Sequence, residues 1–363
     1  MSVKDDRTYL DWNATAPLRP SARSAVNAAL EETGNPSSVH AEGRRARGIV
    51  ERARVQVAEL VGCNPAEVVF TSGATEAASV LRHLAPEHFV RVHAYAHDCL
   101  WAHRDMASAS VARDGPGHVL AMSHANSETG VITERPDPVD GCWSADGVRC
   151  DRLLLDIAQS AGKVHFEFRA SGADLAILSA HKLGGPKGVG ALIVREGMEI
   201  EALLCGGGQE LGRRSGTENV AGIAGFGAAA QDASLDLAAG RWAAAEALRD
   251  DLENALEASA KETIFVGRDS RRLPNTSCFV TPGWKGETQV MQMDLAGFAV
   301  SSGSACSSGR VKGSRVLRAM GLDAQAAECA LRVSIGPTTT ESEVMRFVDA
   351  WTKQEGKLRQ RAA

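Results

Sequence analysis

One lysine of this chain has neighbours suited to covalent chemistry. Lys182 ends the sequence Ser179-Ala180-His181-Lys182, which follows an apolar run and precedes the glycine-rich segment 184–188. A lysine at a strand end beside small residues can be held rigidly and partly desolvated, and desolvation favours the neutral amine that forms a Schiff base. A solvated loop lysine is the alternative. The hydroxyl of Ser179 and the imidazole of His181, which suit a phosphate or a ring, favour the reactive amine.

A carboxylate and a glycine turn stand at the ends of two further apolar runs. Asp156 directly follows Leu153–Leu155. At the carboxyl end of a parallel strand it would point into the ligand crevice, where it could keep a pyridinium nitrogen protonated. A helix N-cap is the alternative. The turn Gly73-Ala74-Thr75 offers amides, a helix dipole and a hydroxyl to a phosphate, or is simply a tight connection between strand and helix.

A cysteine and an arginine nearer the C-terminus complete the candidate set. Cys306 lies within Ser301–Gly309, a run of small polar residues that predicts an exposed, mobile loop. An accessible thiol there suits nucleophilic attack and transfer to a partner, whereas the alternative is an incidental surface cysteine. Arg332 stands in the apolar run Leu331–Ser334 and needs an anionic partner, either a substrate carboxylate or a structural ion pair.

Alternating strands and helices must position these residues. Residues 40–61 have apolar side chains at three- and four-residue spacing and predict a helix that Gly62 ends. A second helix, with Val80, Leu81 and Leu84 on one face, follows the glycine turn. Strands are predicted at Glu67–Phe70, Val90–Ala94, His118–Met122, Arg152–Asp156, Leu175–Ser179 and Val189–Val194. The alternation predicts a mainly parallel sheet in an α/β domain.

The chain changes character after about residue 260. Residues 232–260 predict one long helix, and the domain boundary is expected inside it. Strand-like Phe279–Val280 and Ala299–Val300, followed by a closing helix over 341–357, indicate a smaller α+β domain.

Composition narrows the class of protein. The 363 residues carry a net charge of −5, which gives no reason to expect nucleic acid as a partner. No stretch approaches the apolar length of a membrane span, and the polar first residues are unlike a secretory signal, so we expect a cytoplasmic protein that does not contact membranes. The eight cysteines include no CxxC pair, and no disulfide framework is expected.

Together the motifs resemble the cysteine desulfurases, pyridoxal-phosphate (PLP) enzymes of the class V aminotransferase group. The resemblance extends from Tyr9 to about Thr340. The matching motifs are Tyr9–Pro17, Gly34–His40, Thr71–Glu76, Ser179–Lys182, Arg214–Thr217 and Ser301–Cys306. The cysteine loop resembles that of the first desulfurase group, which has the longer loop and serves iron–sulfur assembly and nitrogen fixation.

The resemblance implies a fold and a reaction. The fold would be the aspartate aminotransferase-like α/β fold of PLP-dependent transferases (fold type I). A large domain with a mainly parallel seven-stranded sheet would span 15–245, and a smaller α+β domain carrying the cysteine loop would comprise 1–14 and 246–363. The enzyme would convert L-cysteine to L-alanine and keep the sulfur on Cys306 as a persulfide, for a sulfur-acceptor protein such as an iron–sulfur scaffold. No metal is expected.

The resemblance also implies a role for each matching residue. Lys182 would hold PLP, Asp156 would pair with its pyridine nitrogen, and Gln159 would reach its ring hydroxyl. His97 would stack on the ring and assist proton transfer, and Arg332 would bind the substrate carboxylate. Further cofactor contacts would come from Ala74, Thr75, Asn126, Ser127, Ser179, His181 and, from the other subunit of a homodimer, Thr217; Asn13 would contact the substrate.

Three departures from the family pattern bear on rate and substrate preference. Ser127 replaces the second of two asparagines, the stretch from His97 to Asn126 is short enough to have lost a strand or helix, and Pro337 alters the segment after Arg332. A selenocysteine lyase or another class V enzyme is one alternative, although plain transamination has no use for the cysteine loop. A non-catalytic scaffold for sulfur acceptors is another, which the retained candidate residues argue against.

Overall fold

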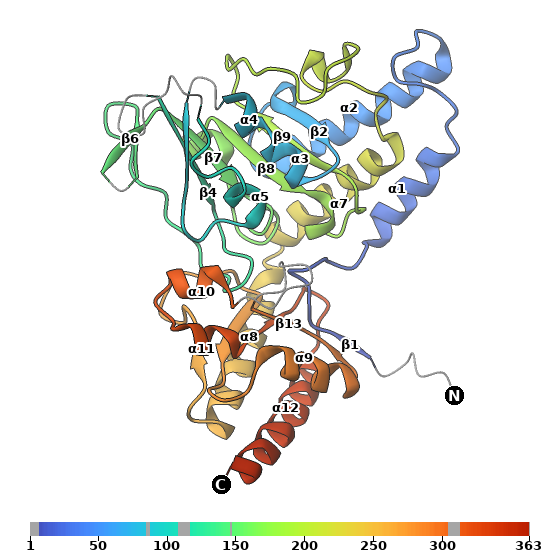
Figure 1. Cartoon of the computed structure of the whole chain (residues 1–363). Helices are drawn as coiled ribbons and strands as arrows, with labels where there is room; N and C mark the ends of the chain where they lie inside the picture. The colour runs from blue at the N-terminus through green and yellow to red at the C-terminus, as the bar shows by residue number, and fades with distance from the viewer. Residues whose placement is uncertain (1–6, 85–87, 108–116, 146, 304–312, 363) are drawn as a thin grey trace. The chain divides into compact units, whose positions relative to one another are not determined.

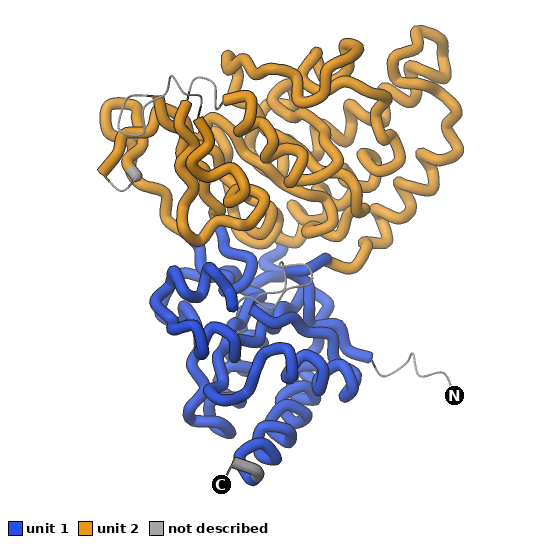
Figure 2. The backbone as a smooth tube through the Cα atoms, viewed as in Figure 1, with its two compact units in different colours: residues 1–15, 125–132, 239–363 blue, residues 16–124, 133–238 orange. Residues whose placement is uncertain are grey.

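The computed structural model describes residues 7–84, 88–107, 117–145, 147–303 and 313–362, which form two compact units (Figures 1 and 2). The large unit comprises the described parts of 16–124 and 133–238. The small unit comprises those of 1–15, 125–132 and 239–363. The domain division expected from the sequence placed residues 125–132 in the large domain, whereas in the structure they belong to the small unit.

A mixed sheet forms the centre of the large unit. Its strand order is β2-β9-β8-β7-β4-β3. The strands are β2 Val68–Thr71, β3 Phe89–Val92, β4 His118–Ser123, β7 Arg152–Asp156, β8 Leu175–Ser179 and β9 Gly190–Val194. Only β9 runs antiparallel to its neighbours, so the sheet is mainly parallel, as predicted. It has six strands among the described residues, where seven were expected, and the described part between β3 and β4 holds only the short helix α5 (Asp98–Trp101).

Helices cover both faces of this sheet, which explains why its strands read as continuous apolar runs. Side chains of one strand alternate between two cores: Leu153 and Leu155 join the first, and Leu154 joins the second. The first core includes residues of α2 (Ala41–Val61) and α7 (Val220–Ala238). Other elements of the unit are α1 Pro20–Leu30, α3 Ala74–Ala78, α4 Val80–Leu84, α6 Phe168–Ser171 and the hairpin strands β5 Trp143–Ala145 and β6 Val148–Cys150.

Of three helix predictions, one is confirmed, and the other two correspond in each case to two helices separated by a break. The helix over 40–61 is confirmed as α2, which ends at Gly62 in the left-handed conformation (φ 65°). The helix after the glycine turn is instead two short helices, α3 and α4, on either side of Ser79. The long helix over 232–260 is also two helices, because α7 ends at Ala238 and Gly240 (φ 65°) precedes α8 (Arg241–Ser259). One glycine in an alanine-rich stretch costs a helix only about 1 kcal/mol, so the pattern conceals the break.

The small unit is built on an antiparallel sheet of order β10-β11-β14-β13. These strands are β10 Ile264–Phe265, β11 Thr276–Val280, β13 Ser301–Ser302 and β14 Ala330–Ser334. A separate parallel pair joins β1 (Thr8–Tyr9) to β12 (Phe298–Ala299). The helices are α8, α9 Gly286–Leu295, α10 Arg315–Ala319, α11 Ala324–Glu328 and α12 Glu341–Ala362. Phe279 and Trp284 both pack on Trp351 of α12, which confirms the predicted closing helix as part of this unit.

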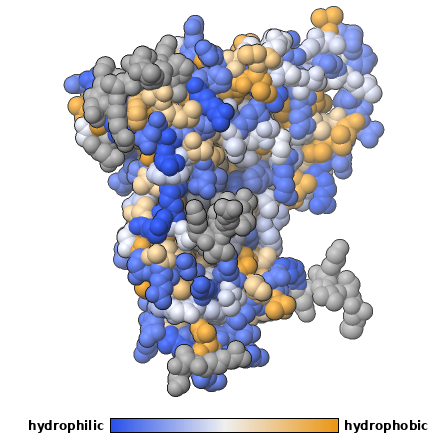
Figure 3. Space-filling model, in the orientation of Figure 1, coloured by the Kyte–Doolittle hydropathy of each residue, from blue (hydrophilic) through white to orange (hydrophobic). Residues whose placement is uncertain are grey.

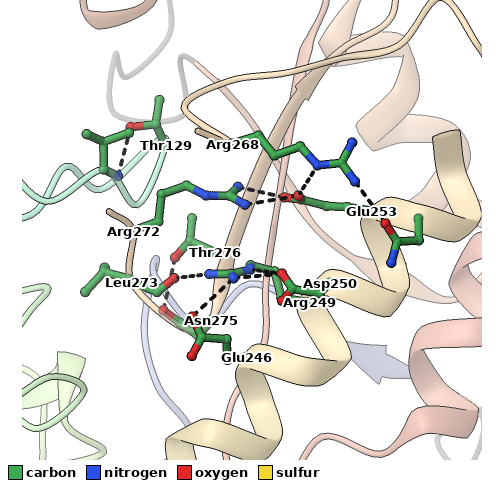
Figure 4. Close-up of polar contacts among 12 residues, drawn as sticks. Thr129, Glu246, Arg249, Asp250, Glu253, Arg268, Arg272, Leu273, Asn275 and Thr276 are labelled. Atoms are coloured by element: carbon green, nitrogen blue, oxygen red, sulfur yellow. Dashed lines mark hydrogen bonds and ion pairs between the residues drawn. The ribbon is translucent and has the colours of Figure 1, made fainter. Parts of the chain in front are cut away.

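A buried ion pair and a hydrogen bond attach α8 to the chain just before β11 (Figure 4). The Arg272 guanidinium donates to both Glu253 carboxylate oxygens, at 2.7 and 3.0 Å, and both side chains are buried. Arg249 of α8 donates to the carbonyl of Leu273 at 2.8 Å. Paired charges of this kind tolerate burial because each guanidinium has its acceptors. The residues that follow, 275 and 276, are thereby held in place.

The segment 125–132 belongs to the small unit because backbone bonds attach it there. The Leu273 amide donates to the carbonyl of Gly130 at 2.7 Å. Gly130 has a positive φ of 75°, and a Cβ at this position would lie 2.7 Å from Cβ of Thr276. Only glycine permits this close approach.

The surface is that of a polar protein on the face drawn in Figure 3. Hydrophilic residues predominate there, and apolar ones form small separate patches. Among the described residues, no helix combines the length and apolar character that crossing a membrane requires.

Candidate active site

A serine connects two predicted site residues of the large unit. Ser123 ends β4 and is paired in register with Asp156 at the end of β7. Its hydroxyl donates to Oδ2 of Asp156 at 3.3 Å and accepts from the His97 amide at 3.1 Å. The amide of Ala158 donates to Oδ1 of Asp156 at 3.0 Å. The buried Asp156 carboxylate is therefore fixed close to His97, which precedes α5.

Ser123 was missed from the sequence, although it has the same strand-end position as Asp156. Cys99, which is buried, was not singled out either. Ligand atoms of His97, Cys99 and Asp156 lie within 4.8 Å of one another. Burial raises the pKa of the Cys99 thiol, against the opposing effect of its hydrogen bond with His97, so this thiol is a poor nucleophile.

The predicted lysine motif lies where β8 ends. Ser179 is the last residue of β8, and Ala180–Lys182 form a 3-10 turn. A Cβ at Gly190 would lie 2.7 Å from Cα of Gly73, so glycine lets the 73–75 turn pack directly on the sheet. Ser179 Oγ lies 3.9 Å from the Cβ position of Gly73. The structure thus brings Ser179 to the glycine turn, where α3 begins at Ala74 and Thr75 is exposed.

His181 is neutral at physiological pH. Burial lowers its pKa to about 4, and the charges of Lys182 and Lys187 act in the same direction. A neutral imidazole still carries one N–H, so it can donate to an anion. The buried Gln159, which follows Asp156 on the next turn, accepts a hydrogen bond from the buried Lys163, a residue that the sequence did not single out.

Thr217 lies in a cavity of about 160 Å³ that Thr71, Ser72 and Gly188 also line. Its segment is tied to α3, because Arg214 donates to the carboxylate of Glu76 at 2.9 Å. Thr217 itself is exposed.

The small unit holds the predicted carboxylate-binding arginine. Arg332 on β14 is 3% exposed. Its Nη2 donates to Oδ1 of Asp11 at 2.6 Å, and its Nη1 donates to the carbonyl of Ser127 at 3.0 Å. The structural ion pair that was the alternative interpretation is therefore present. The third guanidinium nitrogen, Nε, is buried, and no described residue accepts its hydrogen.

Two further predicted residues of this unit, Asn13 and Asn126, form hydrogen bonds with or within the turn that contains Ser127. The Asn13 side chain donates to the carbonyl of Ser127 at 3.2 Å and to Oγ1 of Thr276 at 2.8 Å. Asn126 uses Oδ1 to accept from the amides of Glu128 and Thr129, both at 2.9 Å, and so closes the turn that presents the Ser127 carbonyl. Asn13, Ser127 and Arg332 are thus brought together.

Cys306 lies outside the described residues. The strand that leads to it, β13, is described and pairs antiparallel with β14, with Ser301 opposite Arg332. Ser301 also donates to Oδ2 of Asp11 at 2.8 Å.

Comparisons with known proteins decide the family. The family model for aminotransferase class V matches residues 8–94 and 104–347. A cysteine desulfurase of Cereibacter sphaeroides is 38% identical over 379 residues, which cover 95% of this chain and 94% of that protein. The chain belongs to the cysteine desulfurases. A cysteine desulfurase of a Frankia strain is 39% identical over 391 residues, covering 94% and 89% of the two chains.

A solved structure agrees with this assignment. A NifS-like protein from Rickettsia africae superposes with a TM-score of 0.83 at 26% identity, covering 96% of this chain and 99% of the other. The predicted α/β fold of PLP-dependent transferases is confirmed, and cysteine desulfurases are PLP-dependent enzymes that act on L-cysteine.

The donor set of the large unit fits PLP. A pyridinium nitrogen needs a fixed carboxylate, which Asp156 provides, and an aldehyde needs an amine, which Lys182 provides. A phosphate needs donors without a competing negative charge, and the neutral His181, the Ser179 hydroxyl and the glycine turn meet that need.

Proposed function

We propose that this desulfurase transfers the sulfur of L-cysteine to Cys306 as a persulfide and releases L-alanine. In that step the carbon–sulfur bond of the substrate breaks and a sulfur–sulfur bond forms at Cys306, so no external oxidant is needed. The observation that carries the proposal is the buried Nε of Arg332, a donor that no described residue satisfies. A buried unsatisfied donor is costly, and a substrate carboxylate would satisfy it.

The large unit would hold the cofactor. When bound, PLP supplies an electron sink for the bonds at the substrate α-carbon. Lys182 would hold the cofactor through its amine and then carry protons to and from the substrate. Asp156 would keep the proton on the ring nitrogen, supported by Ser123 and the Ala158 amide, and His97 would stack on the ring.

The phosphate would be bound by residues of the 73–75 turn with Ser179 and His181. Thr217 would serve the site of a second subunit, which makes a homodimer part of the proposal. Closed two-fold dimers are the commonest assembly. Light scattering on purified protein tests this, because a fully active monomer would contradict a shared site.

The small unit would hold the substrate and pass on the sulfur. Arg332 would bind the carboxylate of cysteine, with Asn13 beside it. Ser301 is paired with Arg332 across β13 and β14, so the segment from Ser301 to Cys306 begins next to the residue proposed to bind the substrate. We further propose that the acceptor of the persulfide is a protein such as an iron–sulfur scaffold in the cytoplasm.

The central experiment is to replace Cys306 by Ser and give the protein cysteine. We expect PLP and cysteine to bind normally, because Lys182 and Arg332 are untouched, and alanine and sulfide production to be abolished. Cys205, an exposed cysteine of the large unit, provides the matched control, and Cys205→Ser should behave as wild type. Alanine release at the wild-type rate by Cys306→Ser, or a persulfide mapped by mass spectrometry to another cysteine, would contradict the proposal.

A further inference from the structure

A buried lysine contacts the glutamine proposed for the ring hydroxyl. Lys163 is 3% exposed and Gln159 is 5% exposed. The Lys163 ammonium donates to Oε1 of Gln159 at 2.8 Å, and both atoms lie in the interior of the large unit. Transferring an ammonium group from water to the protein interior is unfavourable, so a buried lysine requires hydrogen-bond acceptors or an opposite charge around its ammonium group.

The segment that presents both residues is a rigid turn. The amides of Ser160 and Ala161 donate to the carbonyl of Ile157 at 3.1 and 2.9 Å, and the Lys163 amide donates to the carbonyl of Ser160 at 3.0 Å. Gly162 has a positive φ of 72°, and a Cβ there would lie 2.8 Å from Cβ of Ala233 on α7. The turn that begins at Asp156 therefore carries Gln159 and Lys163 in a fixed relation.

The chemistry of lysine decides which end of the amide faces it. An ammonium group has three donors and no acceptor, whereas a glutamine side chain has one acceptor oxygen and one donor nitrogen. Only Oε1 can face Nζ of Lys163, so Nε2 with its two hydrogens is turned away from the lysine. The lysine therefore favours the orientation of the amide in which the nitrogen is directed elsewhere.

We infer that Lys163 is a positioning residue that fixes Gln159 as a hydrogen-bond donor to the ring hydroxyl oxygen of bound PLP. The inference rests on the proposed role of Gln159 and extends it to a residue that does not touch the cofactor. The lysine also polarises the amide, because hydrogen bonds in a chain strengthen one another in a low-dielectric interior. Loss of the lysine would remove the charge that holds the Gln159 oxygen and would favour less strongly the orientation in which the nitrogen donates to the ring oxygen.

A double-mutant cycle on the full chain tests the inference. Apo protein is titrated with PLP for the four combinations of wild type, Lys163→Met, Gln159→Ala and both, and the visible absorption maximum of each loaded protein is recorded. We expect Lys163→Met to weaken PLP binding about three- to tenfold and to shift the band, because one hydrogen bond is lost. In the Gln159→Ala background it should change neither quantity further. Ser160→Ala, a buried change in the same turn, should leave the band in place.

Equal losses from Lys163→Met in both backgrounds would overturn the inference, since the lysine would then act independently of Gln159. If melting of the apo protein shows that Lys163→Met does not fold, Gln159→Glu decides. This variant keeps an acceptor for Lys163 but has no donor for the ring, so wild-type affinity and absorption would also overturn the inference. Wild-type behaviour of Gln159→Ala alone would remove Gln159 from the proposed site, while the Cys306 experiment would still stand on its own.

Discussion

In the large unit the candidate residues stand at the ends of neighbouring sheet strands, whereas in the small unit they are held by segments far apart in the sequence. Asp156 and Ser179 end β7 and β8, and their surroundings are backbone amides and short turns. Arg332 instead depends on Asp11 and on the carbonyl of Ser127, which are hundreds of residues away along the chain.

The difference teaches which kind of chemistry each unit can support. Residues at strand ends of a sheet covered on both faces have little freedom, which suits a cofactor that must be held in one orientation. Arg332 uses one hydrogen of each Nη within the protein, and no described residue accepts from its Nε, an arrangement that would suit binding and release of a small substrate. Variants of the strand-end residues in the large unit should therefore act on the cofactor and on turnover, and variants of Arg332 on substrate affinity.

In the large unit, the largest effect is expected for Lys182→Ala. This variant removes the amine that holds PLP and carries protons, so turnover should fall by at least about 10²- to 10⁴-fold. The purified protein should lack a cofactor band that borohydride can reduce. Persistence of such a band would mean that another amine holds PLP and that the role proposed for Lys182 is wrong.

Asp156→Asn should come next. An amide cannot keep the ring nitrogen protonated as a carboxylate does, so alanine production should fall by about 10²- to 10³-fold while PLP still binds. Ser123→Ala is the graded control, because it removes one hydrogen bond to Asp156 and leaves the charge. Near-normal turnover of Asp156→Asn would remove the carboxylate from the mechanism.

Arg332→Lys should produce a smaller effect of a different kind. Lysine keeps the charge but loses the fork, and charge-assisted hydrogen bonds contribute about 1.5–3 kcal/mol, so KM for cysteine should rise about 10- to 100-fold with a smaller change in kcat. Steady-state kinetics separate the two constants. If Arg332 served only its ion pair with Asp11, the melting temperature would fall and KM would not change.

The success of the sequence predictions follows the same division. The strands and α2 could be predicted, and Asp156 and Ser179 could be placed at strand ends, because short motifs and apolar periodicity encode them locally. The Asp11–Arg332 pair and the position of 125–132 in the small unit could not, since they depend on contacts between distant segments. Ser123 and Lys163 belong to no motif that was recognised, and Gly240 breaks a helix whose composition favours continuity. Residues with local signals were found, and residues that act through a neighbour were not.

The smallest expected effect concerns stability in acid, for which the two units differ in their histidine content. The residues of the small unit include no histidine, so histidine titration there cannot contribute. In the large unit the pKa of His181 is about 4, below the value of about 6.5 for an unfolded histidine. Between these values the unfolded chain binds more protons, so the stability that neutral His181 contributes is complete above about pH 6.5 and is lost as the pH falls toward 4.

His181→Gln removes this titrating group from the apo protein and keeps a side chain that can donate. We expect the free energy of unfolding of wild-type apo protein to fall more between about pH 7.5 and about pH 5 than that of His181→Gln. Denaturant titration of both proteins at these two pH values measures the difference. PLP should shrink the wild-type fall, because a phosphate beside His181 favours its protonated form and so raises its pKa. Hydrogen exchange would assign the difference to the large unit, whose backbone should lose protection on acidification more in wild type than in the variant, while the small unit should respond alike in both. Equal acid sensitivity of the two apo proteins would mean that His181 is hydrated rather than desolvated, and its proposed place in the phosphate site would then lack its electrostatic basis.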